Sequence, residues 1–225
     1  MRNINFAIEE FYHIYNRGTE KRQIFLDRAD YFRFTVLLYL ANSESPINMR
    51  ETRIIGPNYE NLSRINQGEI LVDIGAYCLM PNHFHLLLRE RVEGGISKFM
   101  LRLMTAYTMY FNGRHERVGS LWQGVFKAQH ADSDNYLKYL FSYIHLNPIK
   151  LIQKDWKEKG IKDIIKAKKY LKEYRYSSYL DYMEESRYQK IILNKKNFPE
   201  YFKDSIDFKK DIFDWLSFDP NKLDL

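Results

Sequence analysis

The stretch EILVDIGAYCLMPNHFHLLLRE, residues 69–90, decides the fold, because it predicts two neighbouring β-strands and the turn between them. Residues 69–80 are apolar and rich in strand-forming side chains, and Pro81-Asn82 interrupts the run. Residues 83–90 are expected to return as the antiparallel neighbour.

The second strand of this hairpin has two different faces, because successive side chains of a strand point to opposite sides of the sheet. Phe84, Leu86 and Leu88 share an apolar face, whereas His83 and His85 share the other. That pair can be a metal site, part of a basic nucleic-acid surface, or two histidines satisfied by hydrogen bonds in a core.

The flanking segments continue the alternation of strands and helices. Apolar spacing and turn residues predict further elements in this order: a strand at 11–17, a helix at 29–44, a helix at 96–114, a strand or hairpin at 120–131 and a helix at 132–150. The candidate helix caps are Asp27 or Asp30 and Asp132 or Ser133. This order predicts an α+β fold with a ferredoxin-like or RRM-like antiparallel sheet and helices on one face.

Two segments stand apart from this pattern. Residues 43–68 form a long polar connection with two prolines and two glycines, and long loops in compact domains are usually functional or mobile. After residue 150 the composition shifts to Lys, Tyr and Asp. We therefore expect one domain at 1–150 and a mostly helical C-terminal extension at 151–225.

Composition excludes several classes of protein. The 225 residues are 45% hydrophobic and 16% aromatic, which is typical of a globular chain, and 35 Lys and Arg against 29 Asp and Glu suit a phosphate-rich partner. The single cysteine, Cys78, excludes an internal disulfide and a cysteine-based zinc site. Residues 1–18 lack a secretory signal and no apolar run is long enough to span a bilayer, so we expect a cytoplasmic protein without a membrane partner.

The 132–150 segment carries a second candidate group. Tyr143 and Asn147 are four residues apart, so both lie on one face of the predicted helix. Leu140 and Ile144 lie on the neighbouring face and would pack against the sheet. Tyr143 is then either a half-buried tyrosine at a helix edge or a phenol nucleophile with an amide oxygen one turn away.

Four segments together resemble the IS200-like single-tyrosine (Y1) transposases, in particular their REP-associated tyrosine transposase branch. They are YHIYNRG at 12–18, PNHFHLLL at 81–88, GSLWQGVFK at 119–127 and YLKYLFSYIHLNPIK at 136–150. These enzymes are HUH endonucleases, named for two histidines that flank a bulky hydrophobic residue, here Phe84. The resemblance covers about residues 10–150 in the expected order.

The resemblance implies a metal-dependent single-stranded DNA endonuclease and strand transferase that forms a 5′-phosphotyrosine at hairpin-flanked sites. It implies Tyr143 as the catalytic nucleophile and His83, His85 and Asn147 as metal ligands. His13 on the first strand is a substitute ligand. A set of nitrogen and oxygen ligands with open positions favours Mg²⁺ or Mn²⁺ over structural zinc.

The implied partner is single-stranded or hairpin DNA. Candidate phosphate contacts are cationic side chains near the motifs, and one tryptophan is a candidate for stacking on an unpaired base: Arg17, Arg89, Arg102, Lys127 and Trp122. For each there is a simpler interpretation. Surface cations are mostly solvated, and a tryptophan at the start of an apolar strand is usually in the core.

Other functions fit the same fold order. A non-catalytic nucleic-acid-binding module of RRM-like fold would use the histidines and Tyr143 only for packing or stacking, but HFHLLLRE lacks the aromatic and basic signature of such modules. A two-histidine phosphoesterase would need a second histidine motif, which the sequence lacks. A homodimer and a monomer both remain open, with the tyrosine helix supplied in trans or in cis.

Overall fold

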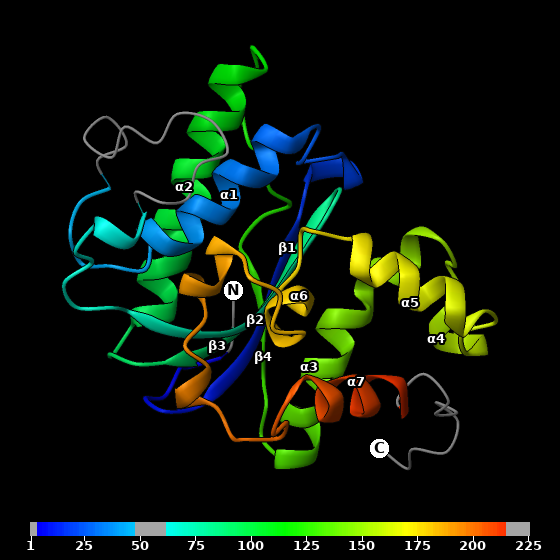
Figure 1. The fold of residues 1–225 in the computed structure, drawn as a ribbon. Helices are drawn as coiled ribbons and strands as arrows, with labels where there is room; N and C mark the ends of the chain where they lie inside the picture. Colours follow the sequence, from blue (N-terminus) through cyan, green and yellow to red (C-terminus); the bar gives the residue numbers. More distant parts are fainter. Residues whose placement is uncertain (1–3, 48–61, 215–225) are drawn as a thin grey trace.

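The computed structural model describes residues 4–47 and 62–214, which build an antiparallel four-stranded sheet with helices on both sides (Figure 1). The strands lie in the order β2-β3-β1-β4, and their bounds are β1 Phe11–Arg17, β2 Val72–Met80, β3 His83–Glu90 and β4 Lys127–His130. The hairpin at 69–90 is confirmed, because Met80 pairs with His83 across the turn.

One face of the sheet carries α1 (Arg28–Leu40) and α2 (Gly95–Arg114), which lie side by side in Figure 1. Phe84 and Leu86 of β3 and Phe34 of α1 are fully buried in the core between the sheet and these helices. The apolar face of the 83–90 strand is therefore the face on which the main core forms.

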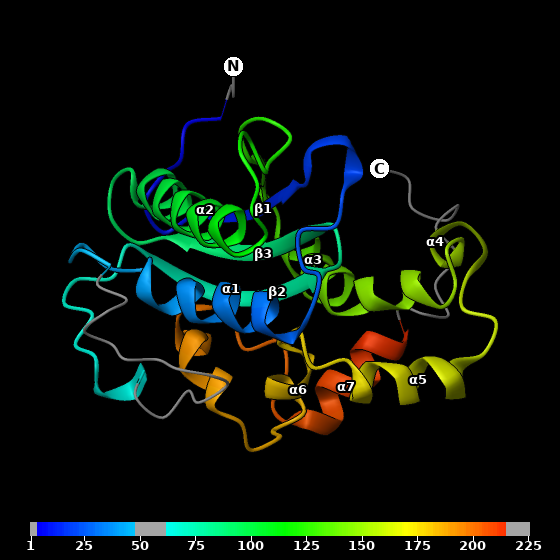
Figure 2. The same ribbon diagram turned by 90° about the horizontal axis from the view of Figure 1, so that it is seen from above.

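The opposite face is covered by α3 and by the C-terminal extension (Figure 2). The elements here are α3 Asp134–Leu146, a 3₁₀ turn at Asn147–Leu151, α4 Trp156–Lys159, α5 Ile164–Glu173, α6 Tyr179–Tyr182 and α7 Ser205–Asp214. The predicted α+β class with an antiparallel sheet is confirmed. The expectation of helices on one face holds for α1 and α2 only.

The α3 helix begins at Ser133, whose hydroxyl accepts the N–H of Tyr136 as an N-cap. The strand expected at 120–131 is much shorter in the structure, where only Lys127–His130 form β4. Gly124 has φ of +69°, and this left-handed conformation turns the chain before β4.

The extension also closes an edge of the sheet. The N–H of Leu79 donates to the carbonyl of Tyr176 at 2.9 Å, and the N–H of Ser178 donates to the carbonyl of Tyr77 at 2.9 Å. The hydroxyl of Ser178 lies 2.7 Å from Nε2 of the buried His145 on α3. These contacts give the free edge of β2 partners and fix α3 to the extension.

Parts of two predicted segments lie outside the described residues, namely 48–61 of the polar connection and 215–225 of the extension. Asn42 precedes residues 48–61 and Gln67 follows them, and the Gln67 amide donates a hydrogen bond to the Asn42 carbonyl. No helix among the described residues is long and apolar enough to cross a membrane.

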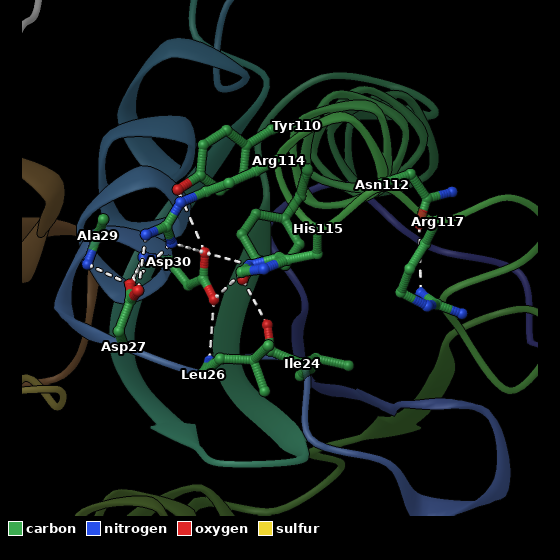
Figure 3. A network of polar contacts seen from close by, with 11 residues as sticks. Ile24, Leu26, Asp27, Ala29, Asp30, Tyr110, Asn112, Arg114, His115 and Arg117 are labelled. Atoms are coloured by element: carbon green, nitrogen blue, oxygen red, sulfur yellow. Dashed lines mark hydrogen bonds and ion pairs between the residues drawn. The ribbon is translucent and has the colours of Figure 1, made fainter.

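A buried carboxylate joins the start of α1 to the end of α2 (Figure 3). Asp30 accepts hydrogen bonds from the N–H of Leu26 at 2.9 Å and from Arg114 at 2.6 Å. The Tyr110 hydroxyl and His115 Nε2 contact it at 3.2 and 3.1 Å. Removal of the carboxylate takes a partner from each of these groups, although Arg114 keeps its bonds to Asp27.

We expect Asp30→Ala to lower the free energy of unfolding by about 3 kcal/mol, because it breaks a buried ion pair and removes the acceptor of several neighbouring donors at once. Asp27→Ala is the matched control. It removes another carboxylate that binds Arg114, but this one is half exposed. Its loss should cost only about 1 kcal/mol. Urea unfolding of both variants measures the difference, and equal losses would contradict a structural role specific to Asp30.

Candidate active site

The second face of the central strands gathers the candidate catalytic residues. In the β1–β3 register, Tyr15 lies opposite His85 and Arg17 lies opposite His83. His13 follows on the same face of β1, because it is two residues from Tyr15. We call the surface formed by His13, Tyr15, His83 and His85 the histidine face.

His13 and His85 form a hydrogen-bonded pair. Nε2 of His13 lies 2.8 Å from Nδ1 of His85, and both side chains are buried. This bond uses one nitrogen of each ring and fixes the orientation of His85, whose Nε2 is the remaining ring nitrogen. His13, predicted as a substitute ligand, is placed where it orients His85.

His83 is oriented by its neighbour in the turn. Its Nδ1 lies 2.6 Å from Oδ1 of Asn82, and the Asn82 amide donates to the carbonyl of Lys21 at 3.1 Å. An amide oxygen only accepts, so Nδ1 of His83 carries the proton and Nε2 keeps its lone pair. This is the arrangement in which a second residue fixes the tautomer of a metal-binding histidine.

Burial keeps the three imidazoles neutral. It lowers the pKa of His13 and of His83 to about 4, with Lys157 adding to the effect at both. The pKa of His85 lies well below its usual value, chiefly through burial and then through the neighbouring histidines. Neutral imidazole is the form that binds a metal ion.

Tyr143 of α3 lies over this face. Its ring centroid is 5.4 Å from that of His85 and 5.6 Å from that of His13, at interplanar angles of 79° and 82°. Tyr139, one turn earlier, stacks near Tyr143 with centroids 5.8 Å apart. A single chain therefore brings the predicted nucleophile to the histidines without help from a second copy.

Asn147 has an oxygen with no partner. Its amide nitrogen donates to the carbonyl of Tyr143 at 2.9 Å, while Oδ1 is buried and accepts no hydrogen bond from the described residues. A buried acceptor left in this way needs an explanation, such as an ion. Two neutral imidazoles, from His83 and His85, and one amide oxygen are donor types that can hold a divalent metal ion.

Clusters of metal-binding side chains are absent from the described part of the chain. Among residues 4–47 and 62–214, no group of three or more His, Cys, Asp and Glu side chains is arranged to hold a metal ion. The predicted ligand set of His83, His85 and Asn147 contains only two residues of these types, so that absence does not bear on it.

Two of the predicted DNA contacts lie near the site. Arg17 is exposed and lies opposite His83 in the β1–β3 register, with its Nε hydrogen-bonded to Gln123. Lys127 is exposed at the start of β4 and lies opposite Tyr15, so its side chain leaves the sheet on the histidine face.

The other three predicted DNA contacts, Arg89, Arg102 and Trp122, lie away from the histidine face or already bind other residues of the protein. Arg89 forms ion pairs with Asp73 at 2.9 Å and Glu9 at 2.7 Å, at the end of β3 far from His83. Arg102 donates to the carbonyl of Ala41 on the α1–α2 side.

Trp122 is only 6% exposed and packs against Phe84, so its interior position contradicts stacking on an unpaired base. Its indole N–H donates to the hydroxyl of Thr108 at 2.9 Å. The simpler interpretation, a core tryptophan, is the correct one.

Sequence reasoning missed three side chains at the site. Tyr15 and Asn82 carry a recognisable signal, because strand alternation puts Tyr15 beside His13 and Asn82 directly precedes His83. Lys157 has no such signal in the sequence, since it is one of many lysines in the extension. Its Nζ lies 3.8 Å from the ring centroid of Tyr143, and burial lowers the pKa of Lys157 to about 8.

Comparisons with known proteins found similarity to one family and to a solved structure. The family described as IS200-like transposases matches residues 48–147, which include His83, His85, Tyr143 and Asn147. A solved structure of a REP-associated tyrosine transposase bound to a REP hairpin has a similar fold, with a TM-score of 0.50 and 11% sequence identity. The match covers 84% of this chain and 89% of that one. No curated protein matches the sequence.

Proposed function

Because residues 48–147 match the family of IS200-like transposases, we propose that the chain is such a transposase and that it cuts and rejoins single-stranded DNA with Tyr143 as the nucleophile. The observation that carries the proposal is the position of Tyr143. The centroid of its ring lies within 6 Å of the centroids of the His13 and His85 imidazoles in the same chain. The Asn147 side-chain oxygen, which has no partner among the described residues, belongs to the next helical turn.

The proposed cleavage is a transesterification. The phenol oxygen of Tyr143 bonds to the scissile phosphorus, and the bond from phosphorus to the 3′ oxygen breaks. The phenol loses its proton and the departing 3′ oxygen takes one up, so the products are a 5′-phosphotyrosine and a free 3′-hydroxyl. The number of phosphate ester bonds is unchanged, and rejoining therefore needs no separate energy source.

The other residues would bind and orient. His83, His85 and Asn147 would hold a Mg²⁺ or Mn²⁺ ion that offsets the negative charge of the scissile phosphate. His13 and Asn82 fix the rings of His85 and His83, so that the remaining nitrogen of each ring is kept as the ligand.

The proposed substrate is single-stranded DNA next to a hairpin. Support comes from the neighbouring structure, whose transposase is bound to a REP hairpin. Arg17 and Lys127, exposed on the side of the histidine face, are the proposed phosphate contacts. We place the nuclease in residues 1–150 and assign 151–225 to an extension, whose described part shares a core with α3.

The test uses end-labelled hairpin oligonucleotides from the flanks of the gene, incubated with the full chain and Mn²⁺ or EDTA. Transposase chemistry gives a metal-dependent protein–DNA adduct on a denaturing gel and a released strand that a polymerase can extend from its 3′-hydroxyl. DNA that is shifted on a native gel but never cut would instead support a non-catalytic binding module.

Complementation tests whether the tyrosine acts in cis. Each chain brings Tyr143 to its own histidines, so a mixture of Tyr143→Phe and His83→Ala chains should stay inactive, with adduct below about 5% of wild type. The two variants are mixed at equal concentration, refolded together and assayed on the gel. Recovery of a quarter or more of wild-type adduct would show that protomers exchange α3.

A further inference from the structure

The C-terminal extension places the ammonium group of Lys157 beside Tyr143, the proposed nucleophile. After α3 the chain continues through the 3₁₀ turn at Asn147–Leu151 into α4, where Trp156 is buried in the core shared with α3. The amide of Gln153 donates to the carbonyl of Gly160 at 2.7 Å, and its oxygen accepts the N–H of Lys162 at 3.0 Å. The α4 turn is thus fixed at both ends, and Lys157 projects from it.

Lys157 faces Tyr143 and forms no salt bridge with any residue that the structure describes, although Glu158 is its neighbour in the chain. Its Nζ lies 3.8 Å from the centroid of the Tyr143 ring, the shortest cation–ring distance among the described residues. The salt bridges formed by residues 4–47 and 62–214 do not include Lys157, whereas Lys159 on the same helix pairs with Asp155 at 3.1 Å. Burying part of a cation without a direct ion pair costs free energy, which points to a functional reason for its position.

We propose that Lys157 is a positioning residue of the cleavage site, which acts through Tyr143 by stabilising the negative charge of the tyrosinate and holding its ring over the histidine face. This inference rests on the proposed function. It assigns an active-site role to a residue of the extension, beyond the residues 48–147 matched by the transposase family.

The physical basis is the charge distribution of the ring. An ammonium over an aromatic face is attracted by the electrons of that face, and the attraction grows when the phenol becomes an anion. Tyr143 carries that charge twice, first as the attacking group in cleavage and again as the leaving group in rejoining. One fixed cation therefore favours both directions, and a neutral side chain of similar length should slow both.

The test compares the rate of adduct formation in single-turnover reactions with saturating hairpin DNA and Mn²⁺. We expect Lys157→Met to lower the rate by at least about tenfold, with hairpin affinity unchanged within about twofold. Lys157→Arg keeps the charge and should recover a third or more of the wild-type rate. Adding ethylammonium to Lys157→Ala should raise its rate in a saturable way, which a purely structural role would not produce.

Lys159→Met is the matched control, because it removes the same charge from the same helix at a site turned to an aspartate. It should keep the wild-type rate. Thermal melting of each variant separates loss of folding from loss of rate. A wild-type rate in Lys157→Met, or an unrescued Lys157→Ala with a native melting temperature, would overturn the inference. In either case a Tyr143-dependent adduct would leave the proposed function standing, and failure of wild type itself to form an adduct would remove both.

Discussion

Tyr143→Phe should abolish the covalent protein–DNA adduct, with a loss of at least about a thousandfold, because removal of a nucleophile leaves no group to form the bond. The ring contacts with His13, His85 and Lys157 need only the aromatic face and edge, so phenylalanine keeps them. Hairpin binding and the melting temperature should therefore stay near wild type. Adduct on a denaturing gel and affinity on a native gel are measured on the same preparation.

Tyr139→Phe is the control for this prediction. Tyr139 lies on the same helix, stacks near Tyr143 and carries the same phenol. Its hydroxyl is not the proposed nucleophile, so adduct formation should stay within about twofold of wild type. The reverse result, with adduct lost in Tyr139→Phe and kept in Tyr143→Phe, would move the nucleophile by one turn.

His83→Ala should remove metal-dependent cleavage and weaken Mn²⁺ binding by about a hundredfold, because it takes away one of two imidazole ligands. Its partner Asn82 lies in a half-exposed turn and can bind water instead, so the fold should survive. Electron paramagnetic resonance of free Mn²⁺ measures binding without DNA, and the gel assay measures cleavage.

His130→Ala is the control for His83→Ala, because it makes the same substitution at another histidine. His130 is also a strand histidine, but it contacts Tyr12 on the α1–α2 side of the sheet and pairs with Glu10. Both Mn²⁺ binding and cleavage should remain as in wild type. If His83→Ala and His130→Ala behaved alike, the histidine face would not be a metal site.

The fold could be predicted where local pattern and tertiary structure agree. Alternation in 83–90 separated Phe84 and Leu86 from His83 and His85, and the structure keeps that separation, with Phe84 and Leu86 in the main core and the histidines on the opposite face of the sheet. The prediction of a strand over 120–131 was only partly right, because the apolar residues before β4 belong to a turn. Trp122 packs under that turn into the core, and only the last residues pair as β4.

The sequence predicts only those site residues whose spacing along the chain places them on one face of a helix or strand. Tyr143 and Asn147 follow from i, i+4 geometry on one helix, and their approach to β3 depends on α3 packing across the second face. Lys157 could not be predicted, because nothing in its neighbourhood in the sequence distinguishes it from Lys154 or Lys159. Its role appears only when the extension folds back over Tyr143.

The measurement that tests the central claim most directly is mass spectrometry of the adduct after digestion with trypsin and nuclease. Cleavage after Lys138 and Lys150 gives the peptide YLFSYIHLNPIK, residues 139–150, which holds both Tyr139 and Tyr143. Fragmentation should place a single nucleotide phosphate on Tyr143. A nucleotide on Tyr139, on a tyrosine of another peptide, or on no tyrosine at all would contradict the assignment of Tyr143 as the nucleophile.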